Sequence, residues 1–253
     1  MHHVRQLLSA ALLSAVTATG CGLDAEDFDL DIQYTPSDPF DNGSHTVGEL
    51  GQARFQMGSC APLLLGPCDL VTPIMAGHQT TMLVDVPEDD GITYVESSNP
   101  EVLVATPVEL TDHGHRRLAL DARVPGATTL MLRRDDGSLL DHVQLEVRAA
   151  TNIRWTIALG EAPEPTEHEG DGQLALSAGE QLYLVARPID GTGRIVNGFG
   201  AMNALLVNGT EAVAQTGNEG GYVVGLEGLG AGQAKLHLST GEALIEVVVT
   251  VAE

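Results

Sequence analysis

Pro125-Gly126-Ala127-Thr128-Thr129-Leu130-Met131-Leu132 is one of many short apolar bursts in this chain. About a hundred residues later it returns, in altered form, as Ala231-Gly232-Gln233-Ala234-Lys235-Leu236-His237-Leu238. A second pair, Ala76-Gly77-His78-Gln79 and Ala178-Gly179-Glu180-Gln181, recurs at nearly the same offset. The recurrence predicts two tandem modules of the same fold.

The rest of the chain from Leu50 onward shows the same pattern of short apolar runs. Apolar residues alternate in short runs, which is the pattern of an antiparallel sandwich, and no window offers a long amphipathic helix. Tight-turn residues separate the runs at Asp90-Gly91, Asp136-Gly137, Asp190-Gly191 and Asn208-Gly209, where hairpins are expected. A repeat of this size fits an immunoglobulin-like sandwich. The expected strands are Arg54–Met57, Thr81–Val86, Arg117–Leu120, Thr129–Leu132, Val143–Val147, Arg154–Leu159, Gln181–Ala186, Tyr222–Val224, Ala234–Leu238 and Leu244–Val251.

The first twenty residues predict an export signal. Arg5 supplies a positive start, and Leu7 to Ala18 form an apolar stretch too short to span a bilayer. Ala18-Thr19-Gly20-Cys21 then resembles a bacterial lipobox, which implies that Cys21 becomes a lipidated, palmitate-bearing N-terminus after cleavage. The alternative is an ordinary secretory signal cleaved near the same small residues, with Cys21 left unpaired.

The cysteines point to the same compartment. Besides Cys21, the chain has only Cys60 and Cys68, which can close a small disulfide loop in an oxidising place such as the periplasm or cell surface. A two-cysteine metal site is the alternative, but this spacing, with no nearby His pair, matches no zinc pattern. Inside the loop, Leu63-Leu64-Leu65 either forms an exposed partner-binding knob or caps the sandwich core; we favour the cap, because large apolar residues are usually buried.

Between the signal and the modules, Asp24 to Asp41 is acidic and rich in turn residues, which predicts an extended tether. A calcium loop of the EF-hand type is the alternative, but Asp38 to Gly43 lacks its order of ligands. The expected organisation is a lipoprotein signal peptide over residues 1–20, the acidic tether over 21–48, a sandwich with the disulfide loop over 49–150 and a second sandwich over 151–253. The linker Ala149–Asn152 is too short for free movement, so Trp155 is expected to pack across the module junction or into the second core.

Charge and composition exclude several classes of function. The 253 residues include 12 Lys plus Arg against 35 Asp plus Glu, for a formal net charge of -23. Nucleic acid is therefore not an expected partner, because clustered cations are needed to hold its phosphates. With 43% hydrophobic residues the chain can bury cores, while 29 Gly and 12 Pro suit short strands and many turns.

A family resemblance strengthens the fold prediction. Ser97-Ser98-Asn99-Pro100-Glu101-Val102, followed by Val124–Leu130, resembles the bacterial immunoglobulin-like group 2 signature of a Ser-Ser-Asn-Pro-x-Val turn and a Gly-x-Ala-x-hydrophobic strand. The second module is similar in Ser177–Glu180 and Gly228–Ala234 but has Val207–Val213 in place of the Ser-Ser-Asn-Pro element. The resemblance implies an all-β protein of two tandem immunoglobulin-like β-sandwiches. Such modules occur in bacterial surface and secreted proteins as spacers, adhesive units or appendages, and they bring no catalytic residues.

Catalytic motifs are missing from the sequence. No serine lies in a Gly-x-Ser-x-Gly elbow, and the Gly-rich run Gly225–Gly232 leads into the strand of Lys235 where a phosphate site needs a helix. The acid pairs Asp89-Asp90 and Asp135-Asp136 precede glycine, where a turn role suffices. We expect no enzyme activity and no cofactor.

Two weak metal candidates remain. His113-Gly114-His115 places two imidazoles on one side of an extended segment, but further ligands are needed. The acidic stretch Glu161–Asp171, which includes Glu169 and Asp171, offers the oxygen ligands that calcium prefers, in no known order. A solvated turn and a flexible acidic loop are the simpler interpretations, so no metal site is predicted.

These observations together predict a lipid-anchored cell-envelope protein that acts by binding, adhesion or spacing. Gly22, where a retention signal would have Asp, points by resemblance to the outer membrane of a Gram-negative cell. The expected partners are the membrane, through the lipid, and other envelope proteins or surface glycans. The alternatives are a subunit of a larger envelope assembly that docks through edge strands, and a metal-dependent envelope enzyme.

Overall fold

A computed structural model describes residues 45–57, 72–86, 94–110, 115–158, 167–198, 201–219 and 222–253. These residues form strands and turns and contain no helix, which confirms the all-β prediction. Accordingly, no helix in the described ranges is long and apolar enough to cross a bilayer. The predicted signal peptide, the tether, Cys21 and the Cys60–Cys68 loop with its leucines lie outside the described residues.

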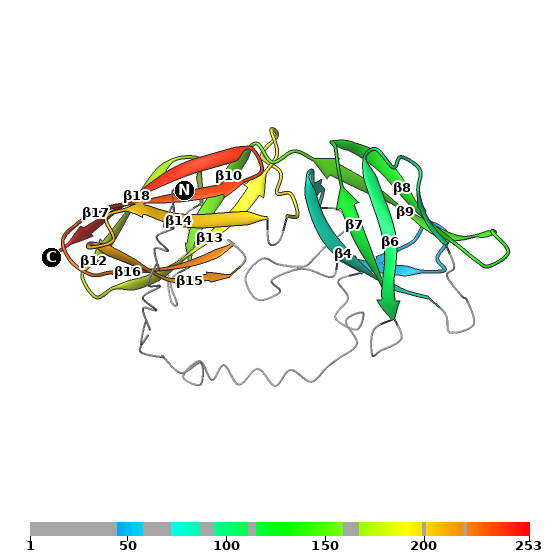
Figure 1. Cartoon of the computed structure of the whole chain (residues 1–253), viewed down its shortest axis with the longest axis horizontal. Helices are drawn as coiled ribbons and strands as arrows, with labels where there is room; N and C mark the ends of the chain where they lie inside the picture. Colours follow the sequence, from blue (N-terminus) through cyan, green and yellow to red (C-terminus); the bar gives the residue numbers. More distant parts are fainter. Residues whose placement is uncertain are drawn as a thin grey trace, which may run out of the picture. The chain divides into compact units, whose positions relative to one another are not determined.

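The first sandwich is built from two sheets that enclose one apolar core (Figure 1). Its largest fully buried side chains include Phe55, Met82 and Leu118. One sheet has the order β1 (Thr46–Val47), β2 (Arg54–Met57), β4 (His78–Asp85), β7 (Arg116–Ala122) and β6 (Leu103–Leu110); the other has β3 (Ile74–Met75), β9 (Leu139–Arg148), β8 (Gly126–Arg133) and β5 (Tyr94–Ser97).

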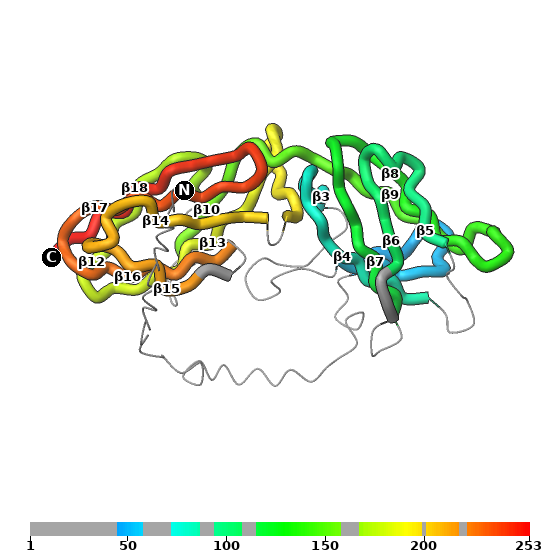
Figure 2. The backbone as a smooth tube through the Cα atoms, in the orientation of Figure 1, coloured from blue at the N-terminus to red at the C-terminus, as the bar shows by residue number. Residues whose placement is uncertain are grey.

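The second sandwich repeats this topology around a core of its own, except that its edge strand β11 follows β10 in the chain whereas β1 precedes β2. In both sandwiches an early strand pairs in parallel with the last strand, β3 with β9 and β12 with β18, while the other pairs are antiparallel. The matching order can be followed along the tube in Figure 2. One sheet has β11 (Glu167–Glu169), β10 (Asn152–Ala158), β13 (Gln181–Ile189), β16 (Val223–Gly228) and β15 (Val213–Glu219); the other has β12 (Gly172–Ser177), β18 (Ala243–Ala252), β17 (Gly232–Thr240) and β14 (Met202–Asn208).

The repeated stretches occupy equivalent places. Gly126 and Gly232 begin β8 and β17, and alternate residues of these strands are buried in the same phase, Leu130 and Leu132 in one and Leu236 and Leu238 in the other. Period-two burial of this kind is what places one face of each strand against the core. The repeat seen in the sequence is therefore a repeat of structure.

The Ser-Ser-Asn-Pro element turns the chain from β5 in one sheet to β6 in the other. Ser97 Oγ lies 2.7 Å from Thr128 Oγ1, and the amides of Val102 and Leu103 both donate to Asn99 O at 3.0 and 3.1 Å. In the second sandwich Ala212 and Val213 donate to Gly209 O in the same way, at 2.9 and 3.0 Å. The same turn is thus made there without the motif.

This result corrects the hairpin predicted at Asn208-Gly209, because that turn joins β14 and β15, which belong to different sheets. The hairpin at Asp136-Gly137 is confirmed, since it joins the antiparallel pair β8 and β9 with Gly137 at a φ of 80°. Near Asp190-Gly191, the residue with positive φ is Gly193, at 81°. Asp90-Gly91 lies outside the described ranges.

Candidate functional site

Of the histidine pair suggested as a metal site, only His115 is described. Its side chain is buried, and Nδ1 lies 3.2 Å from Asp85 Oδ1, while Asp85 Oδ2 accepts from Arg54 Nε at 2.8 Å. These contacts tie the start of β7 to the end of β4 and give the imidazole a structural partner. Among the described residues, no group of three or more His, Cys, Asp or Glu side chains is arranged to hold a metal ion.

Three acids of the suggested calcium cluster are described, Glu167, Glu169 and Asp171, and the latter two serve different strands. Glu169 Oε2 faces Arg154 Nη2 at 3.7 Å, and Glu169 Oε1 accepts from Asn152 Nδ2 at 3.4 Å. Asp171 Oδ1 instead accepts from the backbone amide of Glu246 at 2.7 Å, between β12 and β18. Each of these contacts fastens neighbouring strands to one another.

Trp155 lies in the second core, which decides between the two locations predicted for it. Its side chain is 0% exposed, and indole Nε1 donates to Gly170 O at 3.0 Å. The indole stacks on the His168 ring with centroids 4.2 Å apart. The contacts hold β11 and the turn after it against the sandwich.

Asp141 is a buried carboxylate with a clear structural task. Four backbone amides donate to it, those of Leu50, Gln52, Ala53 and His142, at 2.7 to 2.8 Å. Burial raises the pKa of this carboxyl, but the four donors together outweigh burial and hold the pKa below its ordinary value of 3.8. The charge therefore stabilises the loop that leads into β2.

We expect Asp141→Asn to lower the free energy of unfolding by about 2 kcal/mol at neutral pH, because the four backbone amides then lose their charged acceptor. A lowered pKa in the folded state adds stability above the ordinary carboxyl pKa, and this stability is lost as pH falls through the folded value. The gap between wild type and variant should therefore shrink on acidification below 3.8. Urea titrations at several pH values measure this difference in unfolding free energy. Asp121→Asn is the control, because the Asp121 side chain is 41% exposed. An undiminished gap at low pH would contradict this role for the charge.

The junction between the two sandwiches is joined through the backbone. Met75 N donates to Asn197 O at 2.8 Å, and Asn197 N donates to Pro73 O at 2.6 Å, so that Ile74 and Asn197 form a parallel bridge. Pro73 and Met75 precede β4 in the first sandwich, whereas Asn197 lies between β13 and β14 in the second. One short strand of the first module thus extends a segment of the second.

Apolar side chains close around this bridge. Met75, Ala150 and Val196 form a small buried cluster, with Ala201 packed against it. Thr240 Oγ1 contacts Met75 Sδ at 3.2 Å. The cluster draws residues from the first sandwich, the linker and the second sandwich.

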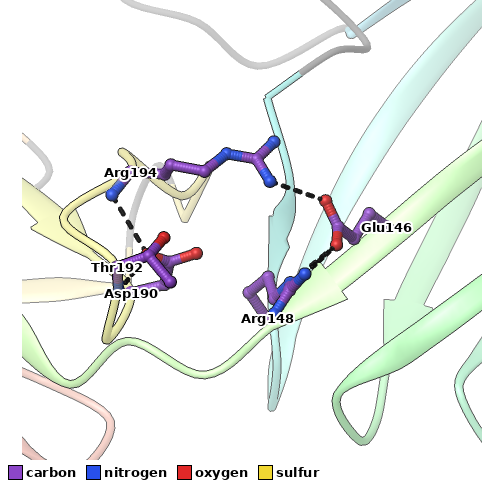
Figure 3. A network of polar contacts seen from close by, with 5 residues as sticks. All are labelled: Glu146, Arg148, Asp190, Thr192 and Arg194. Atoms are coloured by element: carbon purple, nitrogen blue, oxygen red, sulfur yellow. Dashed lines mark hydrogen bonds and ion pairs between the residues drawn. The ribbon is translucent and has the colours of Figure 1, made fainter.

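Figure 3 shows a polar network formed by Glu146 and Arg148 of the first sandwich and Asp190, Thr192 and Arg194 of the second. Glu146 on β9 accepts from Arg148 Nε at 2.7 Å and from Arg194 Nη1 at 3.1 Å, so Arg194 joins the two sandwiches. The Arg148 hydrogen bond is the main reason that the pKa of Glu146 lies below its ordinary value. Asp190 accepts from Thr192 Oγ1 at 2.7 Å and from the Arg194 amide at 3.0 Å, which shapes the turn that presents Arg194.

Sequence reasoning identified only the short linker of this junction. The bridge connects positions more than a hundred residues apart, and neither Met75 nor Asn197 belongs to a recognisable motif. No local pattern in the sequence would have revealed the pair.

The chain is similar to several solved structures of bacterial proteins. Neither a protein-family model nor a curated protein matches the chain. Among solved structures, domains 4 and 5 of the S-layer protein SbsC are similar at 21% identity and a TM-score of 0.29, covering 63% of this chain and 75% of that one. The D00-D0 domain of Intimin is similar at 10% identity and a TM-score of 0.27, covering 73% and 98%. A Bacteroides ovatus glucan-utilisation protein, SGBP-B, is similar at 12% identity and a TM-score of 0.30, covering 71% and 44%.

Proposed function

We propose that this chain is a non-catalytic cell-envelope protein that works as a spacer or binding module, with its two sandwiches held in a fixed relation. The observation that carries the proposal is the backbone pairing of Asn197 with Pro73 and Met75. Modules joined by a linker alone move relative to each other by default. A backbone bridge, a buried cluster and an ion pair at one junction restrict that movement, which is what a spacer requires.

The anchor is the second part of the proposal. Cys21 follows the lipobox-like Ala18-Thr19-Gly20 and would carry the lipid that attaches the protein to the outer membrane, with Cys60 and Cys68 joined as a disulfide. Intact mass of the protein from its native membrane, before and after reduction, tests both. A lipid increment that Cys21→Ala abolishes, and a two-proton gain on reduction, are the expected results. A free thiol at Cys21 in a soluble protein would refute the anchor.

The absence of catalysis is proposed because several ionisable side chains that could serve a reaction have structural partners instead. Asp141 holds four backbone amides, His115 contacts Asp85, and Glu246 contacts both Lys235 and His237 across β17 and β18. A metal-dependent enzyme should purify with stoichiometric metal and lose thermal stability on chelation. We expect neither for this protein.

The junction prediction uses Asn197→Pro, which removes the amide that donates to Pro73 O at 2.6 Å. Proline has no N–H and also restricts the residue before it, so the bridge should open. Spin labels at the exposed residues Glu101 and Glu211, one in each sandwich, report the distance between the modules by pulsed electron resonance. The expected result is a single narrow distance distribution in the wild type and a broad one in the variant.

Arg194→Gln is the matched control at the same junction. The variant removes the ion pair between Arg194 and Glu146. The Arg194 side chain is 47% exposed and that of Glu146 is 33% exposed, and exposed ion pairs contribute only about 0–1 kcal/mol to stability. The distribution should stay narrow in this variant. A distribution that is already broad in the wild type would refute the fixed spacer.

A further inference from the structure

Three neighbouring strands of the second sandwich, β13, β16 and β15, share a row of unusual composition on their outer face (Figure 2). Tyr183 pairs with Gly225, and Gly225 pairs with Gly217; we call these three residues the Tyr183 row. Residues directly opposite each other in antiparallel strands lie on the same face of the sheet. The Tyr183 side chain is 40% exposed and alternates with the buried Leu182 and Leu184, so the row faces solvent.

An aromatic ring and a hydroxyl border the bare backbone of this row. A Cβ added at Gly225 would lie 3.5 Å from Tyr183 Cε1 and 2.5 Å from Thr216 Oγ1. The ring comes from β13 and the hydroxyl from β15, the two strands that flank β16. The register of β15 shifts between Gln215 and Gly217, and such a bulge redirects the side chain within it, here that of Thr216.

The fold itself does not require glycine at position 217. Gly217 and Gly225 are not among the described glycines with a positive φ, and an added Cβ at Gly217 would meet no atom within 4 Å. Glycine inside a strand costs conformational entropy and has no side chain to pack. It often marks a place where a ligand approaches the backbone. The open space at Gly217 therefore points to a binding role.

The first sandwich has the same fold without such a row. Gly77 and Gly179 align the two modules, because each donates its amide at 2.7 Å to the last residue of the corresponding strand, β7 or β16. By this alignment the equivalent row consists of Thr81, Ala119 and Thr106, with no aromatic residue and no glycine. The fold therefore does not impose the composition of the Tyr183 row.

Hydrogen-bonding side chains lie next to the row. Gln181 and Glu227 are directly opposite each other, one pair further along the same strands and about 7 Å from the row. Within the described ranges, neither of these side chains nor the Thr216 hydroxyl has a hydrogen-bond or ion-pair partner. In the first sandwich the equivalent acid, Asp121, accepts from Arg123 Nε at 3.0 Å. The second sandwich thus presents polar groups that are available to a ligand.

We propose that the Tyr183 row and its polar neighbours bind a neutral, β-linked glycan chain. The Tyr183 ring stacks on one sugar, because the partly positive C–H groups of a pyranose suit the negative face of an aromatic ring. The bare backbone lets the chain lie flat against the sheet. Sugar hydroxyls donate to the carboxylate of Glu227 and exchange hydrogen bonds with Gln181 and Thr216.

Charge and exposed area favour this class of ligand. β15 and β16 contain Glu219 and Glu227 but no Lys or Arg, and the chain has a net charge of -23. Anionic glycans and phosphate-bearing polymers are therefore repelled. A protein partner is disfavoured, because Tyr183 is the only large apolar side chain exposed on the described parts of β13, β15 and β16. Stable protein interfaces bury about 800 Å² on each partner.

This inference rests on the proposed function and adds a ligand class to it. One stacking side chain on an open surface gives a weak contact with a single sugar. Repeated sugar units along a polymer raise the overall affinity, because several protein molecules on one envelope can bind the same chain. The site would therefore suit a protein that holds a polymer at a fixed distance from the membrane.

Isothermal titration calorimetry of residues 21–253, carrying Cys21→Ser, tests the site with cellohexaose and chitohexaose as neutral probes. We expect at least one of them to bind, and hexagalacturonate, which is anionic, not to bind. Tyr183→Ala should weaken binding at least about tenfold, whereas Tyr183→Phe keeps the ring and should stay within about threefold of the wild type. Tyr94→Ala is the matched control, because Tyr94 is an exposed tyrosine of the first sandwich, at 53%, and it should leave affinity unchanged.

Gly217→Val separates binding from folding. The added side chain fills the open space, so binding of the neutral hexasaccharide should weaken at least about tenfold. Valine suits a strand and its Cβ meets no neighbour within 4 Å, so the free energy of unfolding in urea should not fall.

Three outcomes would overturn the glycan site: no binding of either neutral hexasaccharide, equally strong binding of hexagalacturonate, or binding that Tyr183→Ala and Gly217→Val leave unchanged. The spin-label distance across the junction tests the proposed function separately. Failed glycan binding with a narrow junction distance leaves the spacer function standing, and a broad junction distance refutes that function whatever the calorimetry shows.

Discussion

Trp155→Ala is expected to lower the free energy of unfolding of the second sandwich by about 4 kcal/mol. The indole is the largest fully buried side chain in the described structure. Its removal leaves a cavity, ends the stacking on His168 and leaves Gly170 O without its donor at 3.0 Å. Neighbouring strands can fill little of that volume, because Gly172 and β10 are fixed by their sheets.

Urea unfolding followed by far-UV circular dichroism measures this effect, since Trp155 is the only tryptophan and its fluorescence is lost in the variant. Tyr183→Ala is the control on the adjacent strand β13, where the side chain is 40% exposed, and it should cost no more than about 1 kcal/mol. A loss of less than 1 kcal/mol for Trp155→Ala would show that the indole does not organise this core.

The contact with Trp155 also explains a residue that sequence reasoning passed over. A Cβ added to Gly172 would overlap the indole at Cζ2. Glycine at this position is therefore a packing requirement set by a residue seventeen positions earlier. A turn signal and a packing glycine look the same in the sequence, and only the fold distinguishes them.

The central strands were predictable from the sequence because their buried faces alternate in apolar runs. All ten expected strands coincide in whole or part with observed ones. All eight edge strands were missed. In β5, β12 and β14, for example, solvent on one side allows residues such as Glu96, Gln173 and Asn203 that break the apolar pattern.

Candidate sites are harder to predict from a sequence than strands, for a physical reason. Clusters such as His113-Gly114-His115 are neighbours in sequence, but a site depends on which side chains the fold brings together. The fold pairs His115 with Asp85 and Asp171 with the Glu246 amide. The fold also pairs Met75 with Asn197, and these two residues are too far apart in the sequence to belong to one motif.

Gly209→Ala is expected to destabilise the second sandwich by about 3 kcal/mol. Gly209 has a φ of 72°, a region that favours glycine, and an added Cβ would lie 2.5 Å from Ala234 Cα and overlap Gln233 O. Both neighbours are backbone atoms of β17, which cannot move without breaking the pairing of β17 with β14 and β18. Strain and overlap therefore add at this position, where the chain passes from one sheet to the other.

Gly137→Ala separates these two contributions. Gly137 has a similar φ of 80°, but an added Cβ would meet no atom within 4 Å, so only the backbone strain of about 1 kcal/mol remains. Urea unfolding of both variants, followed by circular dichroism, gives the difference, which we attribute to the contact with β17. Equal losses for the two variants would mean that β17 yields to the methyl group, and that the turn after β14 is held less tightly than its hydrogen bonds to Ala212 and Val213 imply.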